Sequence, residues 1–379
     1  MNNKSKNKMR ICLIATKFYP DHVGGKAVYA YNYYRELKRQ GYNVYVLTGL
    51  WNKKIDDPNV IQFRIIPKRY LWAITFFFLC LKHLIFNKYD VLHVVGVREG
   101  IITYFLFRRF IATVHDAGSF QVNVNIVQKF YPRIISRADR VIVPSLTTKR
   151  TLKKYIPKIN ENKIFVVMNG VNLEKFHPKN RESALKLKNE MGIDGKIILY
   201  MGIIKTYKGV EEIINAYYKI KEKHKDINLI VAGGPSERMK NKYEVWKQKY
   251  KEVIFTGRVP DIKVPLFYAM ADIFVTYSYT GEGFGLTAVE AMASGTPVVC
   301  SDLEVYREVL NNKAILVPPK DSDQLATAFD HLLSKTENLK KMSTEGRKYV
   351  EKHYSWEKTI KDLLKIYKTI KKGKNYKKQ

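Results

Sequence analysis

Short apolar runs alternate with longer segments of helical periodicity along almost the whole chain. The runs are rich in Val, Ile, Leu and Phe, and glycines, prolines or polar residues bound them. Strands that alternate with helices in this way form parallel sheets covered by helices, so the pattern predicts an α/β protein. The expected strands are 10–15, 43–49, 60–66, 91–96, 110–115, 140–145, 163–170, 196–202, 227–234, 253–257, 273–278, 297–302 and 314–318.

A chain of 379 residues is too long for one ordinary core and predicts two domains. The expected strands divide into two doubly wound parallel sheets in tandem, with the break between segments 167–178 and 179–195. A helix expected over 355–370 has apolar residues at helical spacing, so one of its faces should be buried. We expect a first domain over 1–172, a second over 173–354, and over 355–379 a helix that packs back on the first domain, followed by a basic tail.

The composition is strongly basic, with 67 Lys and Arg against 35 Asp and Glu and a formal net charge of +32. The basic residues are spread along the chain and are concentrated only in the two tails, 2–8 and 371–379. The sequence has no RNA-binding signature and no zinc-finger spacing, so we do not expect nucleic acid as a partner. Anionic lipid headgroups and phosphate-bearing small molecules fit a positive field equally well, and charge alone does not decide between them.

The three cysteines, Cys12, Cys80 and Cys300, lie in apolar runs without metal-ligand spacing. An odd number of scattered cysteines is typical of reduced, buried thiols in a cytosolic protein. The polar start of the chain leads directly into an expected strand and does not resemble a secretory signal. We therefore expect a cytoplasmic protein.

One segment, from Tyr70 to Phe86, is apolar enough to suggest a membrane. It is shorter than the ~20 residues that a spanning helix needs, and Lys82 interrupts it. One interpretation is a helix buried in the core. The other is a helix that lies in the membrane interface, anchored by Trp72 and flanked by Lys68, Arg69 and Lys82.

Two features of the first half are candidates for a binding site. Gly24 and Gly25 stand before a helix expected over Ala27–Arg39, where free N–H groups can approach an anion. The spacing of a dinucleotide fingerprint is absent, and a glycine pair before a helix is often only a turn. His115, followed by Asp116, ends an expected strand, which is where sites of parallel sheets form, although a lone histidine is usually structural. His93 stands among apolar residues and is expected in the core.

The second half opens in the same manner, with a strand, Gly202, a short loop and then Lys208-Gly209 at a helix start. The N-terminus of a helix is a poor place for a cation, so a lysine there suggests a phosphate partner. The alternative is a solvated lysine in a lysine-rich protein.

The segment 281–299 combines three glycines, two glutamates and a helix that Gly295 ends. Glu282 lies in the loop after the expected strand, and the first N–H groups of the helix, at Gly285, Leu286 and Thr287, form an anion site. Glu290 stands on an otherwise apolar stretch, where a buried carboxylate costs several kcal/mol unless it is hydrogen-bonded. A vicinal diol offers two donors to such a carboxylate, so the segment predicts a nucleotide-sugar pocket. The alternative is a pair of structural glutamates.

The chain resembles the retaining glycosyltransferases of family four, which have the GT-B fold. The family signature is a glutamate, seven residues and a second glutamate, and Glu282 and Glu290 match it in EGFGLTAVEAMASGTPVV. Other matching stretches are GGKAVYAYNYYRELKRQGYNVYVLTG, VVMNGVNLEKFHP, GIIKTYKGVEEIINAY and VIFTGRVPDIKVPLFYAMADIFVTYS. The resemblance covers the chain in order, apart from the tails. It implies two Rossmann-like domains facing a cleft, the first on the acceptor side and the second binding the nucleotide-sugar donor.

The resemblance also implies roles for residues. Glu290 would hold the ribose diol, Glu282 would contact hydroxyls of the transferred hexose, and Lys208 would bind the diphosphate. His115 would lie beside the reacting sugar carbon. The remaining donor-binding positions that it implies are Gly24, Gly25, Gly202, Phe284, Gly285, Leu286 and Thr287.

The implied reaction is transfer from a UDP- or GDP-linked sugar to a glycan or lipid-linked glycan, with retained configuration and without a metal or other cofactor. One position departs from the family, because Ile203 stands where an arginine usually follows Gly202; Lys205 or Arg258 could take its place. This puts the donor in question rather than the class of reaction. Two other functions stay open: a nucleotide-sugar epimerase or hydrolase on the same fold, and a non-catalytic basic protein that binds a membrane or nucleic acid.

Overall fold

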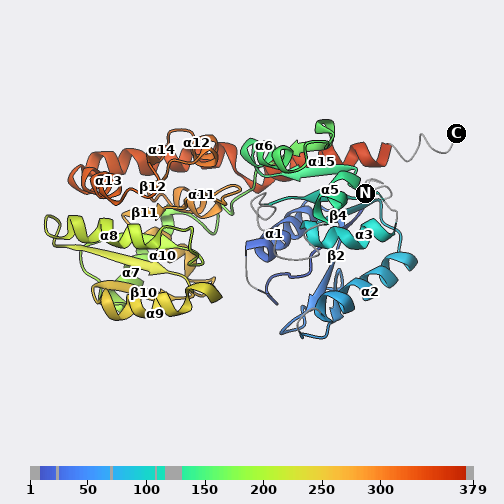
Figure 1. The fold of residues 1–379 in the computed structure, drawn as a ribbon, viewed down its shortest axis with the longest axis horizontal. Coiled ribbons are helices and arrows are strands. Elements are labelled where there is room, and N and C mark those ends of the chain that lie inside the picture. The colour runs from blue at the N-terminus through green and yellow to red at the C-terminus, as the bar shows by residue number, and fades with distance from the viewer. Residues whose placement is uncertain (1–8, 23–24, 69–70, 107–108, 116–129, 373–379) are drawn as a thin grey trace, which may run out of the picture. The chain divides into compact units, whose positions relative to one another are not determined.

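The computed structural model describes residues 9–372, except for 23–24, 69–70, 107–108 and 116–129. The chain divides into two compact units (Figure 1). Unit 1 comprises Met1–Met168 and Trp356–Gln379, and unit 2 comprises Asn169–Ser355. The chain therefore enters unit 2 once, leaves it once and finishes in unit 1.

Unit 1 is built on a parallel sheet of seven strands in the order β3-β2-β1-β4-β5-β6-β7. The strands are β1 (Arg10–Ile14), β2 (Asn43–Leu50), β3 (Val60–Arg64), β4 (Val91–Val94), β5 (Ile111–Thr113), β6 (Arg140–Val143) and β7 (Ile164–Val166). The described helices are α1 (Gly25–Arg39), α2 (Leu71–Phe86), η1 (Val97–Glu99), α3 (Gly100–Phe105), α5 (Tyr131–Arg137), α6 (Leu146–Tyr155), η3 (Glu161–Lys163) and α15 (Trp356–Lys372).

Unit 2 is built on a second parallel sheet, of six strands in the order β10-β9-β8-β11-β12-β13. The strands are β8 (Lys196–Met201), β9 (Ile227–Ala232), β10 (Val253–Gly257), β11 (Ile273–Thr276), β12 (Val298–Ser301) and β13 (Ile315–Val317). The described helices are η4 (Pro178–Asn180), α7 (Arg181–Glu190), α8 (Val210–Lys221), η5 (Glu237–Met239), α9 (Lys240–Lys249), α10 (Val264–Met270), α11 (Leu286–Ala293), α12 (Glu304–Leu310), α13 (Ser322–Ser334) and α14 (Thr336–His353).

Both sheets confirm the α/β prediction of two doubly wound parallel sheets. Each expected strand is present, with its boundaries within four residues of the expected ones. The strand order reverses between β1 and β4 in unit 1 and between β8 and β11 in unit 2. Ligands of such sheets bind outside the carboxyl ends of the strands at this reversal, which directs attention to the loops after β8 and β11.

The C-terminal helix α15 belongs to the core of unit 1. Its Trp356 ring lies against Tyr33 of α1, with ring centroids 5.4 Å apart. His93 of β4 is fully buried, as expected, and bonds to the Tyr367 hydroxyl at 2.6 Å through Nδ1 and to Thr113 Oγ1 at 2.7 Å through Nε2. The three cysteines are buried free thiols, which confirms the expectation of burial.

Helix α2 confirms the interpretation as a buried core helix only in part, and the interpretation as a helix in the membrane interface stays a prediction. One stripe, formed by Phe76, Cys80 and Leu84, is buried, whereas most of the other apolar side chains of the helix are half-buried or exposed. Tyr70 and Arg69 lie outside the described residues. Among the described residues, no helix combines the length and the apolarity that crossing a membrane requires.

Candidate active site

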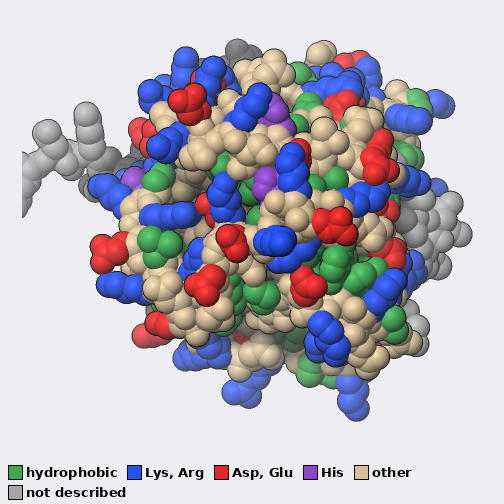
Figure 2. Space-filling model, turned by 90° about the vertical axis from the view of Figure 1, so that its left-hand side faces the viewer, with side chains coloured by type: hydrophobic (Ala, Val, Ile, Leu, Met, Phe, Trp, Pro, Cys, Tyr) green, Lys and Arg blue, Asp and Glu red, His purple; other side chains and the backbone are tan. Residues whose placement is uncertain are grey.

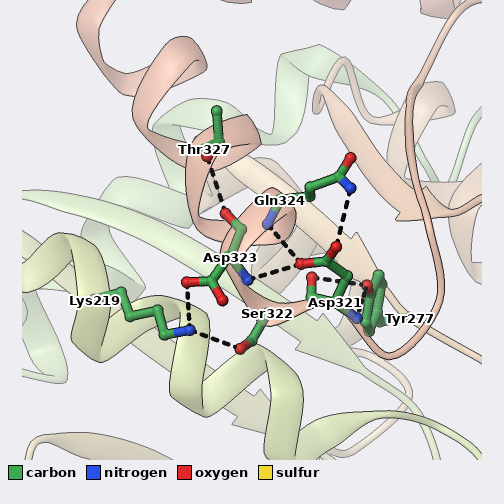
Figure 3. Close-up of polar contacts among 7 residues, drawn as sticks. All are labelled: Lys219, Tyr277, Asp321, Ser322, Asp323, Gln324 and Thr327. Carbon is green, nitrogen blue, oxygen red and sulfur yellow. Dashed lines mark hydrogen bonds and ion pairs between the residues drawn. The ribbon is translucent and has the colours of Figure 1, made fainter.

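The site in unit 2 begins where β11 ends, and a polar network holds this strand end. The Tyr277 hydroxyl bonds to the carbonyl of Pro318 and accepts the N–H of Asp321 at 3.0 Å. Asp321 in turn caps α13, because its carboxylate accepts the N–H groups of Asp323 and Gln324 at 3.1 and 2.9 Å (Figure 3). The loop that follows Tyr277 therefore starts from a fixed point.

Two glycines bring helix N-termini close to this strand end. Gly209, before α8, has φ of 59°, and a Cβ there would lie 2.3 Å from the Tyr277 carbonyl oxygen. Gly285, before α11, has φ of 80°, and a Cβ there would lie 2.5 Å from the Tyr306 ring. Only glycine combines a left-handed backbone with such close approach. No side chain caps α11, so the N–H groups of Leu286 and Thr287 begin the helix uncapped.

Glu282 and Lys208 form an ion pair in this loop region, although 74 residues separate them in the sequence. Their side chains are 13% and 21% exposed, respectively. Ser278, which is fully buried, donates its hydroxyl to the same carboxylate oxygen at 2.8 Å. Lys208 Nζ also lies 5.6 Å from the centre of the Tyr207 ring. The pair places a cation and an anion beside the N-termini of α8 and α11.

Glu290, on α11, occupies a different environment from Glu282. Its carboxylate accepts the hydroxyl of Tyr268 at 3.0 Å, and Tyr268 is fully buried on α10. Desolvation by burial raises the pKa of Glu290 to about 7, and the bond from Tyr268 opposes this rise. Glu290 is half-buried as a residue, and its carboxyl group carries a proton more readily than that of an ordinary glutamate.

Gly202 and Ile203 form the turn after β8. A Cβ on Gly233 would lie 1.9 Å from the Gly202 carbonyl oxygen, so the backbone segments that follow β8 and β9 approach each other closely. Ile203 is 57% exposed, and nothing in the structure explains an isoleucine at this position. Lys205 is exposed and donates to the Tyr207 hydroxyl at 3.2 Å, and Arg258 is also exposed.

Phe284 lies between the two glutamates, but its side chain is buried against the Tyr354 ring, with centroids 5.3 Å apart. A contact between Phe284 and a donor would therefore involve its backbone. The side chain instead fixes the loop that carries Glu282.

The candidates of the first half belong to unit 1. Gly25 begins α1, and a Cβ there would meet no atom within 4 Å, so packing does not require glycine at this position. His115 donates from Nε2 to the Val95 carbonyl at 2.8 Å, and its ring lies 4.2 Å from the centre of the Tyr29 ring. Burial, with a smaller contribution from Lys26, lowers the pKa of His115 to about 3. Its imidazole is neutral, with Nδ1 as the available acceptor. Gly24 and Asp116 lie outside the described residues.

Sequence reasoning missed two polar residues of the site, Ser278 and Tyr268. Ser278 follows β11 after one intervening residue, Tyr277, and Tyr268 is the one hydroxyl of α10. Tyr268 is visible in the sequence as an isolated hydroxyl group in an apolar run, whereas Ser278 stands among other hydroxyl-bearing residues. The residue types alone, however, do not show which carboxylate each hydroxyl contacts. Within the described part of the chain, no three His, Cys, Asp or Glu residues are grouped so that they could hold a metal ion.

Comparison with known families covers both units. The family model described as Glycosyltransferase Family 4 matches residues 23–175, and the one described as Glycosyl transferases group 1 matches residues 182–349. The second match contains Lys208, Glu282 and Glu290. Together the two matches account for most of the chain.

Individual relatives agree with this assignment. An uncharacterized glycosyltransferase of Methanocaldococcus jannaschii is 27% identical over 95% of this chain and 98% of its own. A phosphatidyl-myo-inositol mannosyltransferase of Mycobacterium leprae is 26% identical over 76% of each chain. The structure of Anabaena HepE in complex with UDP-glucose has a TM-score of 0.77 at 17% identity and covers 96% of this chain and 99% of that chain. This chain belongs to the family-four glycosyltransferases, and it is an enzyme of the GT-B fold.

Proposed function

We propose that this enzyme transfers a hexose-type sugar from a UDP- or GDP-linked donor to a glycan or lipid-linked glycan, with retention of anomeric configuration. The observation that carries the proposal is the Lys208–Glu282 pair in the loop region before the uncapped N-terminus of α11, with Glu290 one turn further along the same helix. A nucleoside diphosphate sugar offers a diphosphate to the cation and the helix, and hydroxyl groups to the two carboxylates. The Anabaena HepE structure contains a donor of this kind, UDP-glucose.

In this proposal the ribose diol donates to the carboxylate of Glu290, which Tyr268 orients from its buried side. The diphosphate binds the N–H groups of Leu286 and Thr287, because helix N-termini favour anions. Gly202 and Gly285 let the backbone approach the donor; the same role for Gly25 stays a prediction, and Gly24 lies outside the described residues. The carboxylate of Glu282 then accepts hydrogen bonds from hydroxyl groups of the transferred sugar.

The ion pair between Lys208 and Glu282 gives the site a way to respond to the donor. Without donor, the lysine is neutralised by the glutamate. A diphosphate competes for Lys208, and the released carboxylate becomes available to the sugar. As the sugar leaves, negative charge grows on the diphosphate, and Lys208 with the helix N–H groups stabilises it electrostatically. We propose that this charge stabilisation needs no metal, so activity should survive chelation.

His115 is proposed to lie beside the reacting carbon of the sugar. Its pKa of about 3 keeps the imidazole neutral throughout the working pH range. A neutral ring adds no positive charge next to an oxocarbenium-like carbon, and Nδ1 can accept a sugar hydroxyl because Nε2 is held by Val95. His115 therefore acts as a polar contact and not as a general acid.

The acceptor is proposed to be a glycan or a lipid-linked glycan, used for cell-surface polysaccharide, glycolipid or glycoprotein assembly on the cytoplasmic side of a membrane. The name of the mycobacterial relative, which includes phosphatidyl-myo-inositol, supports a lipid acceptor. The strong positive charge of the chain favours anionic surroundings.

The test is a panel of UDP- and GDP-linked sugars assayed for donor consumption and for the anomeric form of the product. Glu282→Gln should lower kcat/KM by roughly 10²–10³, the loss typical for one electrostatic contact to a transition state. Glu290→Gln should lower kcat/KM through weaker donor binding, seen as a higher donor KM. Glu337→Gln on α14, an exposed glutamate outside the site, should retain activity. Full activity of Glu282→Gln would overturn the proposed site. Inverted product, or epimerised sugar without transfer, would overturn the proposed reaction.

A further inference from the structure

Helix α2 exposes an apolar face that the fold of unit 1 does not cover. Phe76, Cys80 and Leu84 are buried beneath it, at a spacing of one helical turn. The opposite side chains are exposed, up to 60% for Phe78 and 77% for Phe86. We call the following exposed residues the α2 face: Leu71, Ile74, Phe78, Leu79, Ile85 and Phe86.

The α2 face continues onto α3. The Phe77 ring contacts Phe78 and the exposed Phe105 of α3, with centroids 5.3 and 5.7 Å apart. Figure 1 shows α2 at the periphery of its unit, next to α3. Scattered exposed apolar residues are ordinary, but a contiguous patch of aromatic and aliphatic side chains marks an interaction surface.

Basic residues surround the α2 face, and acidic residues are missing from its sequence. Residues 58–89 contain no Asp or Glu. Lys68, Lys82 and Lys88 are exposed in this segment, and Arg98 lies over the Trp72 ring at 5.7 Å. The same face therefore presents apolar side chains and positive charge together.

The two units also differ in net charge, and unit 1, which carries α2, is the more positive one. Unit 1 has 38 Lys and Arg against 11 Asp and Glu, whereas unit 2 has 29 against 24. Nearly all of the net charge of +32 therefore belongs to unit 1, at +27, and only +5 belongs to unit 2. Figure 2 shows a face of unit 2, on the side of α8 and α13, where acidic and basic side chains are interspersed.

The combination of apolar side chains and positive charge favours one kind of partner for the α2 face. A protein partner could cover the apolar residues, but exposed basic residues in a segment without carboxylates are complementary to an anionic surface. A bilayer with anionic headgroups offers both an apolar layer and negative charge, which attracts the basic residues near it. α2 has 16 residues and is too short to span, so it would lie in the plane of the interface.

We propose that the α2 face is the surface by which unit 1 docks on an anionic lipid bilayer, with Phe78, Phe86 and Phe105 inserted below the headgroups. Trp72 is not an inserted anchor in this arrangement. Its ring packs on Trp51, with centroids 5.4 Å apart, and under Arg98, so it supports the helix from the protein side. Docking does not depend on sugar transfer, so this proposal and the proposed function can fail separately.

The experiment measures flotation of the full chain with vesicles of phosphatidylcholine alone or of phosphatidylcholine and phosphatidylglycerol in equal parts. We expect binding to the anionic vesicles, weakened by salt. Phe78→Ser/Phe86→Ser should bind at least about tenfold more weakly, because two apolar side chains no longer become buried in the bilayer. The matched control is Val245→Ser/Ile262→Ser, which removes two apolar residues that are exposed in unit 2, and it should bind as the unaltered chain does.

A second variant separates charge from apolar contact. Lys68→Gln/Lys82→Gln/Lys88→Gln should lose the preference for anionic vesicles while the α2 face is intact. Unchanged binding by the phenylalanine variant, or equal loss in the unit 2 control, would overturn the proposal. The proposal would also be overturned if the unaltered chain did not bind vesicles and formed a dimer, while the phenylalanine variant was monomeric. The α2 face would then join two copies of the chain. Circular dichroism checks that each variant is folded.

Discussion

Among the site residues with a perturbed pKa, Glu290 is the one whose charge should change near neutral pH. Its pKa is raised to about 7, and the proposed contact with a ribose diol requires the carboxylate. Donor KM should therefore rise as the pH falls below about 7. Tyr268→Phe removes the hydrogen bond that favours the charged form, so the pKa of Glu290 should rise further. Such a bond contributes about 1.5–3 kcal/mol, so the midpoint should move up by roughly one to two pH units.

The measurement is donor KM between pH 5.5 and 9, about the range in which a carboxyl with this pKa titrates. Tyr268→Phe should recover near-normal KM at the alkaline end, which a purely structural defect would not do. Glu290→Gln cannot titrate and serves as the control, with high KM at every pH. A Tyr268→Phe profile that matches the unaltered enzyme would show that Tyr268 does not position Glu290.

At the scale of residues, the sequence identifies some of the residues that take part in the contacts of the site, but it does not show which residues pair with one another. Glu282, Glu290 and Lys208 were selected because charged groups in apolar or helix-start positions need partners. Their partners are tertiary: Lys208 meets Glu282 across 74 residues, and Tyr268 meets Glu290 across 22. Spacing along the chain shows such pairs only within one helix, so the pairing could not be predicted.

At the scale of elements, the two helix-start glycines Gly25 and Gly285 differ in what they require. Gly285→Ala places a Cβ 2.5 Å from Tyr306 on a left-handed backbone, where strain alone costs roughly 1–3 kcal/mol. Gly25→Ala introduces a Cβ with no neighbour within 4 Å at a helical position and should be neutral or stabilising by up to about 1 kcal/mol. Thermal unfolding of the two variants measures the difference.

Equal unfolding temperatures for these two variants would contradict the role assigned to Gly285. Donor binding adds a second comparison, because displacement of Tyr306 should also shift the start of α11. Gly285→Ala should therefore weaken donor binding even at temperatures where it is fully folded.

Elements were predictable to different degrees for a physical reason. A strand buried on both faces is apolar throughout, so its run of Val, Ile and Leu identifies it, and the expected strands were found. α2 is equally apolar, but only one stripe is buried. Hydrophobicity predicts that a side chain avoids water. It does not show whether the protein itself or a membrane covers that side chain.

At the scale of the whole molecule, the alternation of elements predicted two parallel sheets but not the strand order within them. The order depends on which strands pair, as β1 does with both β2 and β4, and a local pattern does not contain that information. The apolar face of the last helix predicts that one side of it is buried, but it does not show which unit covers that side. The sequence also did not predict the contact of His93 with the last helix, because His93 is expected only to lie in the core.

The contact between His93 and Tyr367 joins positions 274 residues apart and gives the last prediction. Tyr367→Phe keeps the buried ring but leaves His93 Nδ1 without its 2.6 Å partner. An unsatisfied buried polar atom costs about 1–3 kcal/mol, so unfolding of unit 1 should move to lower denaturant concentration. Tyr42→Phe is the control, because Tyr42 is a half-buried tyrosine that packs against the core of the same unit and takes no part in the contact between His93 and Tyr367. The midpoint is measured by urea titration of Trp fluorescence, since Trp356 lies against Tyr33 at the start of the same helix. If both variants unfold at the midpoint of the unaltered chain, the hydrogen bond does not fasten α15, and the apolar face of the helix suffices.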